Sequence, residues 1–332
     1  MDNELSFSDI REMASGFRVS RIILTGFELG IFTALAGGEK SAAEVAGEIG
    51  ADPRATDRLM NALCAIGLLT KKGDRFHNRE TTRRFLTDES PDYLAGIGHQ
   101  ANLWHRWSTL TEAVRAGGAV ESRPVGERGE EWLRSFIGAM HDRGVKQGPA
   151  MIAAIDLEGV NRVLDLGGGP GDFAMAFVRT DEAITATVFD LPQVIPLTRT
   201  YVEAAGLSDR VDTLAGDFLL DDIGSGYDLI FISAIIHSLS PDDCQFLLRK
   251  CAESLEPGGR IVISDWVMSE DRTEPPEGAL FALNMLVNTR EGDSYTEAEI
   301  HGWFGEAGLV DFSTTSMPFG AALVCGRKPG PA

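Results

Sequence analysis

Apolar residues recur at helical spacing over residues 8–36, from Ile10, Met13 and Phe17 to Phe32 and Leu35. The pattern ends at Gly37-Gly38, so it predicts two helices in this stretch. Both helices are apolar over much of their surface, and such a surface is unfavourable in water. We therefore expect these helices to be buried, with a second copy of the chain as the partner.

The next stretch has the pattern of a winged helix. Ser41-Ala-Ala-Glu44 is a capping box that opens a helix through Ile49. A turn at residues 50–53 leads to a helix with Leu59, Leu63 and Ile66 on one face, and residues 68–70 and 75–77 read as a β-hairpin. Such a module either reads DNA or serves dimerisation. Six basic residues favour DNA binding: Lys71, Lys72, Arg75, Arg79, Arg83 and Arg84. The acidic balance of the chain and the catalytic character of its second half favour dimerisation, which is the function that we expect.

Residues 90–150 are predicted to be helical and are rich in aromatic residues, with Trp104, Trp107 and Trp132. Their rings serve either the core or a substrate pocket. We therefore divide the chain into a winged-helix dimerisation domain (1–95), a helical connector that contributes to a substrate pocket (96–150) and a catalytic domain (151–332).

From Asn161 onward, apolar strands alternate with helical patterns, which is typical of a doubly wound α/β fold. We expect a mostly parallel seven-stranded sheet. Its last two strands should pair as a hairpin, and a turn at Pro257-Gly258-Gly259 should precede the fifth strand. The expected strands are 163–166, 186–189, 211–214, 228–233, 260–264, 310–315 and 321–326, with helices at 242–255 and 296–307.

The stretch Val163–Gly171, Val-Leu-Asp-Leu-Gly-Gly-Gly-Pro-Gly, predicts a strand, a tight turn and a helix. Glycines here let the backbone approach a ligand closely, and the helix that follows directs free N–H groups over the turn. The spacing does not fit the dinucleotide fingerprint, and no Gly-Lys-Ser/Thr follows as in a P-loop. An acid at Asp165 is what methyltransferases place under the amino-acid end of S-adenosylmethionine.

Polar residues also follow the later strands, where doubly wound sheets bind ligands. Asp190 suits the two ribose hydroxyls, while Asp217 and Phe218 suit an adenine, and an acid at either position is equally typical of a helix cap. His237 follows the fourth strand and has the ordinary pKa of a general base near neutral pH. Asp265, at the end of the fifth strand, is placed to orient its imidazole.

Composition narrows the partners. The chain has 332 residues and a net charge of −20, which repels nucleic-acid phosphates. No apolar run approaches the ~20 residues of a membrane span, and the start lacks the regions of a signal peptide, so we expect a cytoplasmic protein. The four scattered cysteines read as reduced core thiols, and the histidines form no ligand pair, so no metal site is expected.

Five motifs together resemble the S-adenosylmethionine-dependent O-methyltransferases of the plant caffeic-acid and bacterial polyketide type. They are the glycine turn at 165–171, Phe189–Pro192, Gly216–Phe218, Ile236-His237 and Leu255–Arg260. The resemblance covers nearly the whole chain and implies a winged-helix homodimer that methylates a small hydroxylated acceptor, with His237 as the base. The implied cofactor residues are Asp165, Gly167, Gly169, Asp190, Leu191, Asp217, Phe218 and Ser233, and the implied acceptor residues are Met140, Arg143, Asn284, Met285 and Asn288.

The chain departs from that family at the site. His237-Ser238-Leu239 stands for the common His-Asp-Trp, and Asp265 and Ser294 stand where plant members have glutamates. Arg143 stands where many plant members have a histidine, and indicates either an acceptor with a negative group or a structural salt bridge. Three alternatives stay open: N- or C-methylation, a transferase that works by alignment alone, and a ligand-sensing winged-helix regulator.

Overall fold

The computed structural model describes residues 4–90, 92–94, 96–121, 128–318 and 320–330. It divides into two compact units, residues 1–102 and 103–332, with the boundary inside helix α7 (Gly96–Trp107). Most of the segment 96–150, which the sequence analysis set apart as a connector, therefore belongs to the second unit.

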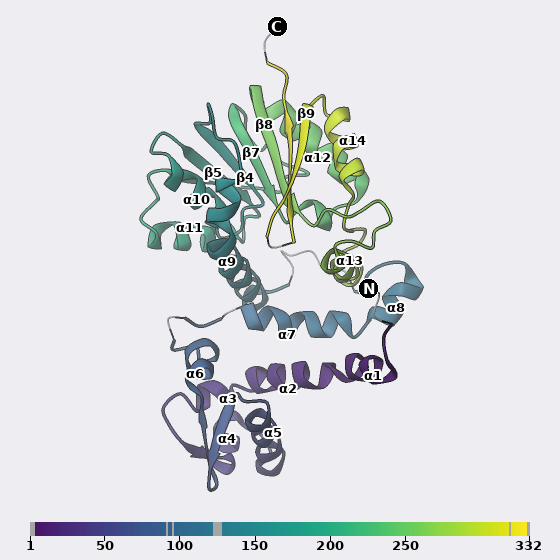
Figure 1. Ribbon diagram of the computed structural model, residues 1–332. Coiled ribbons are helices and arrows are strands. Elements are labelled where there is room, and N and C mark those ends of the chain that lie inside the picture. The colour runs from purple at the N-terminus through teal and green to yellow at the C-terminus, as the bar shows by residue number, and fades with distance from the viewer. Residues whose placement is uncertain (1–3, 91, 95, 122–127, 319, 331–332) are drawn as a thin grey trace. The chain divides into compact units, whose positions relative to one another are not determined.

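The N-terminal unit has the helix, turn, helix and hairpin order that the sequence predicts (Figure 1). Ser41 caps α4 through a capping box with Glu44, and Asp52 caps α5. Strands β2 and β3 pair as the antiparallel hairpin, and β1 pairs with β3. The elements are α1 (Phe7–Ser15), α2 (Phe17–Glu28), α3 (Ile31–Ala34), β1 (Lys40–Ser41), α4 (Ala42–Ile49), α5 (Pro53–Ala65), β2 (Leu69–Lys72), β3 (Arg75–Asn78) and α6 (Glu80–Leu86).

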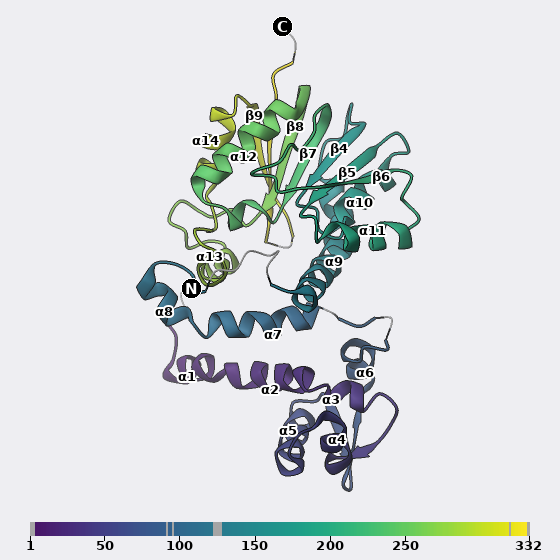
Figure 2. The same cartoon turned by 180° about the vertical axis from the view of Figure 1, so that it is seen from behind.

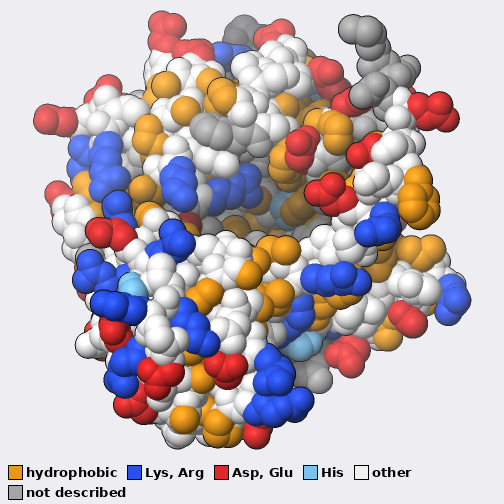
Figure 3. All heavy atoms as spheres, turned by 60° about the horizontal axis from the view of Figure 1, so that its bottom comes forward, with side chains coloured by type: hydrophobic (Ala, Val, Ile, Leu, Met, Phe, Trp, Pro, Cys, Tyr) orange, Lys and Arg blue, Asp and Glu red, His pale blue; other side chains and the backbone are white. Residues whose placement is uncertain are grey.

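Three of the six basic residues noted in the sequence, Lys71, Arg75 and Arg84, have a carboxylate partner. Lys71 lies 3.4 Å from Asp57, Arg75 lies 3.4 Å from Glu44, and Arg84 lies 2.6 Å from Asp92. On the face of the molecule shown in Figure 3, Lys and Arg side chains are interspersed with Asp and Glu. A DNA reader presents a continuous basic face to phosphates, and this pairing does not favour that reading.

The C-terminal unit is built on a seven-stranded sheet of order β6-β5-β4-β7-β8-β10-β9. The first five of these strands run parallel, and β10 pairs antiparallel with both β8 and β9, so the predicted terminal hairpin is confirmed. The strands are β4 (Arg162–Leu166), β5 (Thr185–Asp190), β6 (Val211–Ala215), β7 (Tyr227–Ser233), β8 (Leu255–Asp265), β9 (Val310–Ser316) and β10 (Ala322–Arg327).

Alternate residues along the central strands enter two separate cores. In β7, Ile230 and Ile232 pack with α12 (Pro241–Ser254) and α14 (Glu297–Glu306), whereas Leu229 and Phe231 pack on the other face with α10 (Asp172–Thr180). Figures 1 and 2 show these two helical layers on opposite faces of the sheet. Burial on both faces explains why these strands are continuously apolar in sequence.

The remaining elements are helical: α8 (Leu110–Ala116), α9 (Glu130–Ala153), α11 (Ile195–Ala204), the 3₁₀ turn η2 (Ile236–Ser238) and α13 (Pro276–Asn288). The prediction that a turn at residues 257–259 precedes the fifth strand is wrong, because these residues lie within the strand. Strand β8 already begins at Leu255, which pairs with Tyr227, and regular pairing resumes at Arg260 opposite Leu229. Residues 256–259 therefore form a bulge within the strand, and Gly258, with φ +82°, allows it.

Candidate active site

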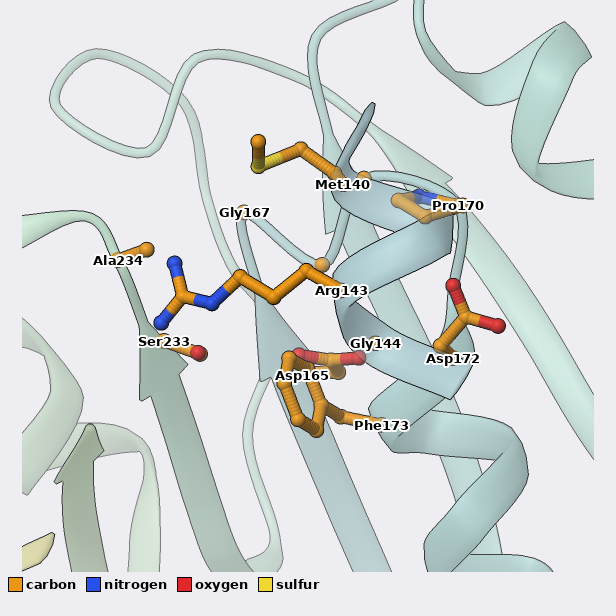
Figure 4. Close-up of a pocket in the computed structure, with 12 residues that line it drawn as sticks. Met140, Arg143, Gly144, Asp165, Gly167, Pro170, Asp172, Phe173, Ser233 and Ala234 are labelled. Carbon is orange, nitrogen blue, oxygen red and sulfur yellow. The ribbon is translucent and has the colours of Figure 1, made fainter. Parts of the chain in front are cut away.

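A narrow cavity lies over the turn between β4 and α10, at the carboxyl end of the parallel strands (Figure 4). Helix α9 forms one wall, the glycine turn forms the floor, and the end of β7 closes the far side. The lining residues are Met140, Arg143, Gly144, Asp165, Gly167, Gly168, Gly169, Pro170, Asp172, Phe173, Ser233 and Ala234.

The glycines of the turn are required by close packing. Gly167 has φ +68°, and a Cβ atom there would lie 2.3 Å from Cδ1 of Ile235. A Cβ on Gly168 would lie 2.6 Å from the Asp165 carboxylate. Neither position accepts a side chain, so the bare backbone of the turn faces the cavity.

Asp165 lies buried beneath this turn. Its Oδ2 accepts a hydrogen bond from the backbone N–H of Ala174, 3.0 Å away, while its Oδ1 has no partner among the described residues. Burial, with smaller contributions from the charges of Asp190 and Asp172, raises the pKa of Asp165 to about 7, against the lowering effect of the hydrogen bond from Ala174. A cationic group in the cavity would offset the free-energy cost of removing this carboxylate from water. The hydroxyl of Ser233 is likewise buried without a described partner.

Asp190 ties strand β5 to the turn. Its Oδ2 accepts from the N–H of Gly169 and its Oδ1 from the N–H of Leu191, both at 2.7 Å. Burial raises the pKa of Asp190 to about 6, against the lowering effect of these hydrogen bonds. Asp217 instead accepts a hydrogen bond from the N–H of Leu219, as a capping residue does.

These features fit S-adenosylmethionine, whose amino-acid end carries an ammonium group and whose sulfur is cationic. The Asp165 oxygen that lacks a described donor, together with a cradle that a Cβ would fill, suits a cation held against bare backbone. Phe218 lies near this turn, since a Cβ on Gly167 would be 3.9 Å from its ring.

His237 lies in the turn η2, directly after β7. Its Nδ1 is 2.8 Å from Oδ1 and 3.0 Å from Oδ2 of Asp265, which ends the neighbouring strand β8. The side chain of His237 is 12% exposed and that of Asp265 is 2% exposed. The carboxylate thus favours a proton on Nδ1 and leaves Nε2 free to accept one.

Two neighbours of this pair were not anticipated from the sequence. The ring of Phe281, on α13, packs edge-on against the imidazole with centroids 4.7 Å apart. The ring of Trp266 lies next to Phe281, with centroids 6.2 Å apart. Helix α13 was not predicted as an element, although Phe281 and Met285 at i, i+4 are the kind of pattern that predicts one.

The predicted acceptor residues separate into two groups. Met140 and Arg143 line the same cavity as Asp165. Asn284, Met285 and Asn288 lie on α13. There the side-chain oxygen of Asn284 accepts hydrogen bonds from the indole of Trp107 and from Asn288, at 3.0 and 3.1 Å.

Arg143 extends from α9 across the cavity toward Ser233 and Ala234 (Figure 4). Its Nε donates to Gln147, 3.0 Å away, and within the described part of the chain it forms no salt bridge. Burial lowers the pKa of Arg143, and the charge of Asp265 acts in the opposite direction. The described residues therefore do not contain the structural salt bridge that was one of the two alternatives for Arg143.

Ala234 has φ +58°, a strained backbone for a residue with a side chain, at the point where β7 leads into the His237 turn. Within the described residues, no cluster of three or more His, Cys, Asp or Glu side chains is arranged to hold a metal ion. None of the described helices combines the length and the apolar character needed to cross a membrane.

Comparisons with known proteins agree with this geometry. Residues 107–310 match the model of an O-methyltransferase domain, and residues 11–88 match an O-methyltransferase dimerisation domain. A 3-hydroxy-5-methyl-1-naphthoate 3-O-methyltransferase of Streptomyces sahachiroi is 32% identical over 96% of this chain and 94% of its own. The tetracenomycin polyketide synthesis 8-O-methyl transferase TcmO of Streptomyces glaucescens is 31% identical over 97% of this chain and 96% of its own.

Among solved structures, human N-acetylserotonin methyltransferase in complex with S-adenosylmethionine superimposes with a TM-score of 0.81. It is 26% identical, and the match covers 99% of this chain and 100% of the human one.

Proposed function

The chain belongs to the S-adenosylmethionine-dependent O-methyltransferases, and from that premise we propose that it methylates a hydroxyl of a small aromatic or polyketide-like acceptor. It is an enzyme, and S-adenosylmethionine is its cofactor. The two Streptomyces relatives bear names of enzymes that methylate hydroxyls of a naphthoate and of a polyketide. These names support the acceptor class.

The observation that carries the proposed mechanism is the pairing of His237 with Asp265. When bound, S-adenosylmethionine would supply the methyl group from its sulfonium, and S-adenosylhomocysteine, a neutral thioether, would leave. Asp265 holds the His237 proton on Nδ1, and Nε2 takes the proton of the acceptor hydroxyl. General-base catalysis of this kind contributes roughly 10²–10⁴-fold. Both side chains are largely buried, which limits the access of water to the pair.

Other residues bind and align. We assign Asp165, Gly167, Gly169, Asp190, Leu191, Asp217, Phe218 and Ser233 to the cofactor, and Asn284, Met285, Asn288, Met140 and Arg143 to the acceptor. Arg143 reaches into the cavity without a carboxylate partner among the described residues, which supports an acceptor that carries a negative group.

We also propose that the enzyme is a homodimer and works in the cytoplasm. The dimerisation-domain match supports the first proposal. Four free cysteines, two of them buried, support a reducing compartment.

A mass-spectrometric screen tests the function. The purified enzyme and S-adenosylmethionine are incubated with hydroxynaphthoates, other phenols and polyketides, and with amine analogues in which the hydroxyl is replaced. We expect one methyl group to be added to the hydroxyl compounds only, and carboxylated phenols to have a lower KM than uncharged ones. An Arg143→Met variant should lose that difference in KM. Methylation of the amines or of ring carbon alone would contradict the proposal.

A further inference from the structure

A second histidine–aspartate pair lies on the other side of the glycine turn, outside the catalytic pair. Nδ1 of His141, on α9, is 3.0 Å from each carboxylate oxygen of Asp172, the first residue of α10. The side chain of Asp172 is 5% exposed and that of His141 is 33% exposed. Asp172 follows Gly171 directly, so the pair joins α9 to the end of the glycine turn.

Packing fixes this pair on two sides. The His141 ring stacks on Tyr201 of α11, with centroids 4.3 Å apart and planes at 28°. Near it on α9, Gly144 lies so close to α10 that a Cβ there would be 2.6 Å from Cβ of Asp172. The close approach of the two helices at Gly144 places His141 within hydrogen-bond distance of Asp172.

The same turn of α9 forms the wall of the cofactor cavity. Met140 precedes His141, Arg143 follows two residues later, and both line the cavity together with Gly144 and Asp172. His141 therefore lies on the same turn of α9 as two cavity-lining side chains. Neither Asp172 nor His141 has a role in the catalytic pair of His237 and Asp265.

We propose that His141 and Asp172 form a clasp that positions α9 over the cofactor cavity, and that the clasp tightens when His141 is protonated. The inference rests on the proposed cofactor site and adds two positioning residues to it. A cation on His141 strengthens its contact with the Asp172 carboxylate, because a charge-assisted hydrogen bond is stronger than a neutral one. Cofactor affinity is then coupled to the charge of a residue that lines no part of the cavity itself.

The charges around the clasp determine the direction of the pH dependence. The hydrogen bond with Asp172 raises the pKa of His141 most, burial opposes it, and Asp142 on the same helix adds to the increase. From α11, Tyr201 contributes its ring, and its own pKa is raised by burial. The charge of Arg134, on α9, lowers the pKa of Tyr201 and so opposes the effect of burial. The clasp is therefore strongest at low pH and weakens as the pH rises through the raised pKa of His141.

The titration of Asp165 changes cofactor affinity with pH in the opposite direction to that of His141. The Asp165 pKa of about 7 means that the carboxylate under the glycine turn is lost as the pH falls below neutral. Asp190, with a pKa of about 6, follows at lower pH. We expect cofactor affinity to pass through a maximum near neutral pH, with the acidic decline due to these two carboxylates and the alkaline decline due to His141.

Calorimetric titration with S-adenosylhomocysteine between pH 6 and 9 tests the clasp without turnover. His141→Gln keeps a donor for Asp172 but does not titrate. We expect the wild-type affinity to fall threefold to tenfold from pH 7 to 9 and the His141→Gln affinity to change less than twofold. Asp172→Asn should bind threefold to tenfold more weakly than wild type at pH 6.5, where protonated His141 loses its carboxylate.

His301→Gln is the matched control, because His301 lies 3.7 Å from Glu297 and beside Phe312, far from the cavity in the layer of α14. Its profile should follow that of wild type. An alkaline decline in His141→Gln equal to that of wild type would overturn the clasp. Failure of the wild-type protein to bind S-adenosylhomocysteine at any pH would instead count against the proposed function, so the two failures are distinguishable.

Discussion

At the scale of single residues, the imidazole of His237 is held by one carboxylate and one aromatic edge. We predict that His237→Gln lowers turnover about 10²-fold at pH 7, because the acceptor hydroxyl loses its base. The loss should shrink toward pH 10, where a phenol ionises unaided. Steady-state kinetics across this range, with calorimetry to show unchanged S-adenosylhomocysteine affinity, measures both effects.

A second variant, Asp265→Asn, keeps the shape of the pair but disfavours a protonated imidazole, and Ser294→Ala is the control. Asp265→Asn should lose turnover as well, whereas Ser294→Ala should not. Ser294 donates its hydroxyl to the carbonyl of Gly278, 3.0 Å away, and does not contact the imidazole. Wild-type turnover in His237→Gln would show that alignment alone drives the reaction.

The sequence identified His237 and Asp265 because each directly follows a recognisable strand, and the carboxyl ends of neighbouring parallel strands meet. It did not identify the pair of His141 and Asp172. These residues are 31 positions apart on two helices, and no periodicity relates a long connecting helix to the end of a glycine turn. Phe281 was missed for the same reason, since its contact with His237 depends on how α13 packs.

At the scale of elements, the turn between β4 and α10 lowers the stability of the cofactor-free protein and provides the proposed cofactor site. Because the pKa of Asp165 is raised from 3.8 to about 7, the folded chain holds its proton more tightly than the unfolded chain. The free energy of unfolding of the cofactor-free protein therefore falls as the pH rises from about 4 to 7. By pH 8 this single residue costs roughly 2–4 kcal/mol.

We predict that Asp165→Asn raises the melting temperature of the cofactor-free protein by roughly 4–10 °C at pH 8 and hardly at all at pH 5. The same variant should bind S-adenosylhomocysteine at least tenfold more weakly, because the buried anion is gone. Calorimetric unfolding at both pH values measures the first effect. Asp209→Asn, an exposed carboxylate, serves as the control and should change neither. A lower melting temperature for Asp165→Asn at pH 8 would contradict this explanation.

The elements themselves were largely predictable because local chemistry specifies them. Ser41 and Thr296 open their helices through capping boxes at the positions that the sequence indicates. The sequence predicts a turn where the structure has the bulge of residues 256–259, because glycine and proline are typical of turns and of bulges alike. Only the pairing of Leu255 with Tyr227, a non-local contact, distinguishes them.

At the scale of the whole molecule, an apolar stripe of the N-terminal unit remains exposed. Helix α1 has no buried residue in this single chain, although its sequence is amphipathic. The residues of the stripe and their exposed fractions are Leu5 58%, Phe7 80%, Ile10 56%, Met13 68%, Phe17 54% and Val19 48%. The dimerisation-domain match begins at residue 11, within this stripe, which supports a second copy of the chain as its partner.

Net charge opposes such an association, since each chain carries −20. Repulsion between two copies is screened by salt, whereas burial of the apolar stripe is not weakened by it. The dimer should therefore tighten as salt is added. This dependence is the opposite of that expected for an interface held by ion pairs between the copies.

We predict that the double variant Ile10→Glu/Met13→Glu dissociates to monomers at concentrations where wild type is a dimer. Burial of one large apolar side chain contributes about 1.5–3 kcal/mol, so removing two should weaken association at least 100-fold. Sedimentation velocity over a concentration series measures the change. Leu220→Glu is the control, because Leu220 is 82% exposed but lies in the catalytic unit, and it should sediment as wild type. A double variant that still sediments as a dimer would show that the two copies meet through another surface.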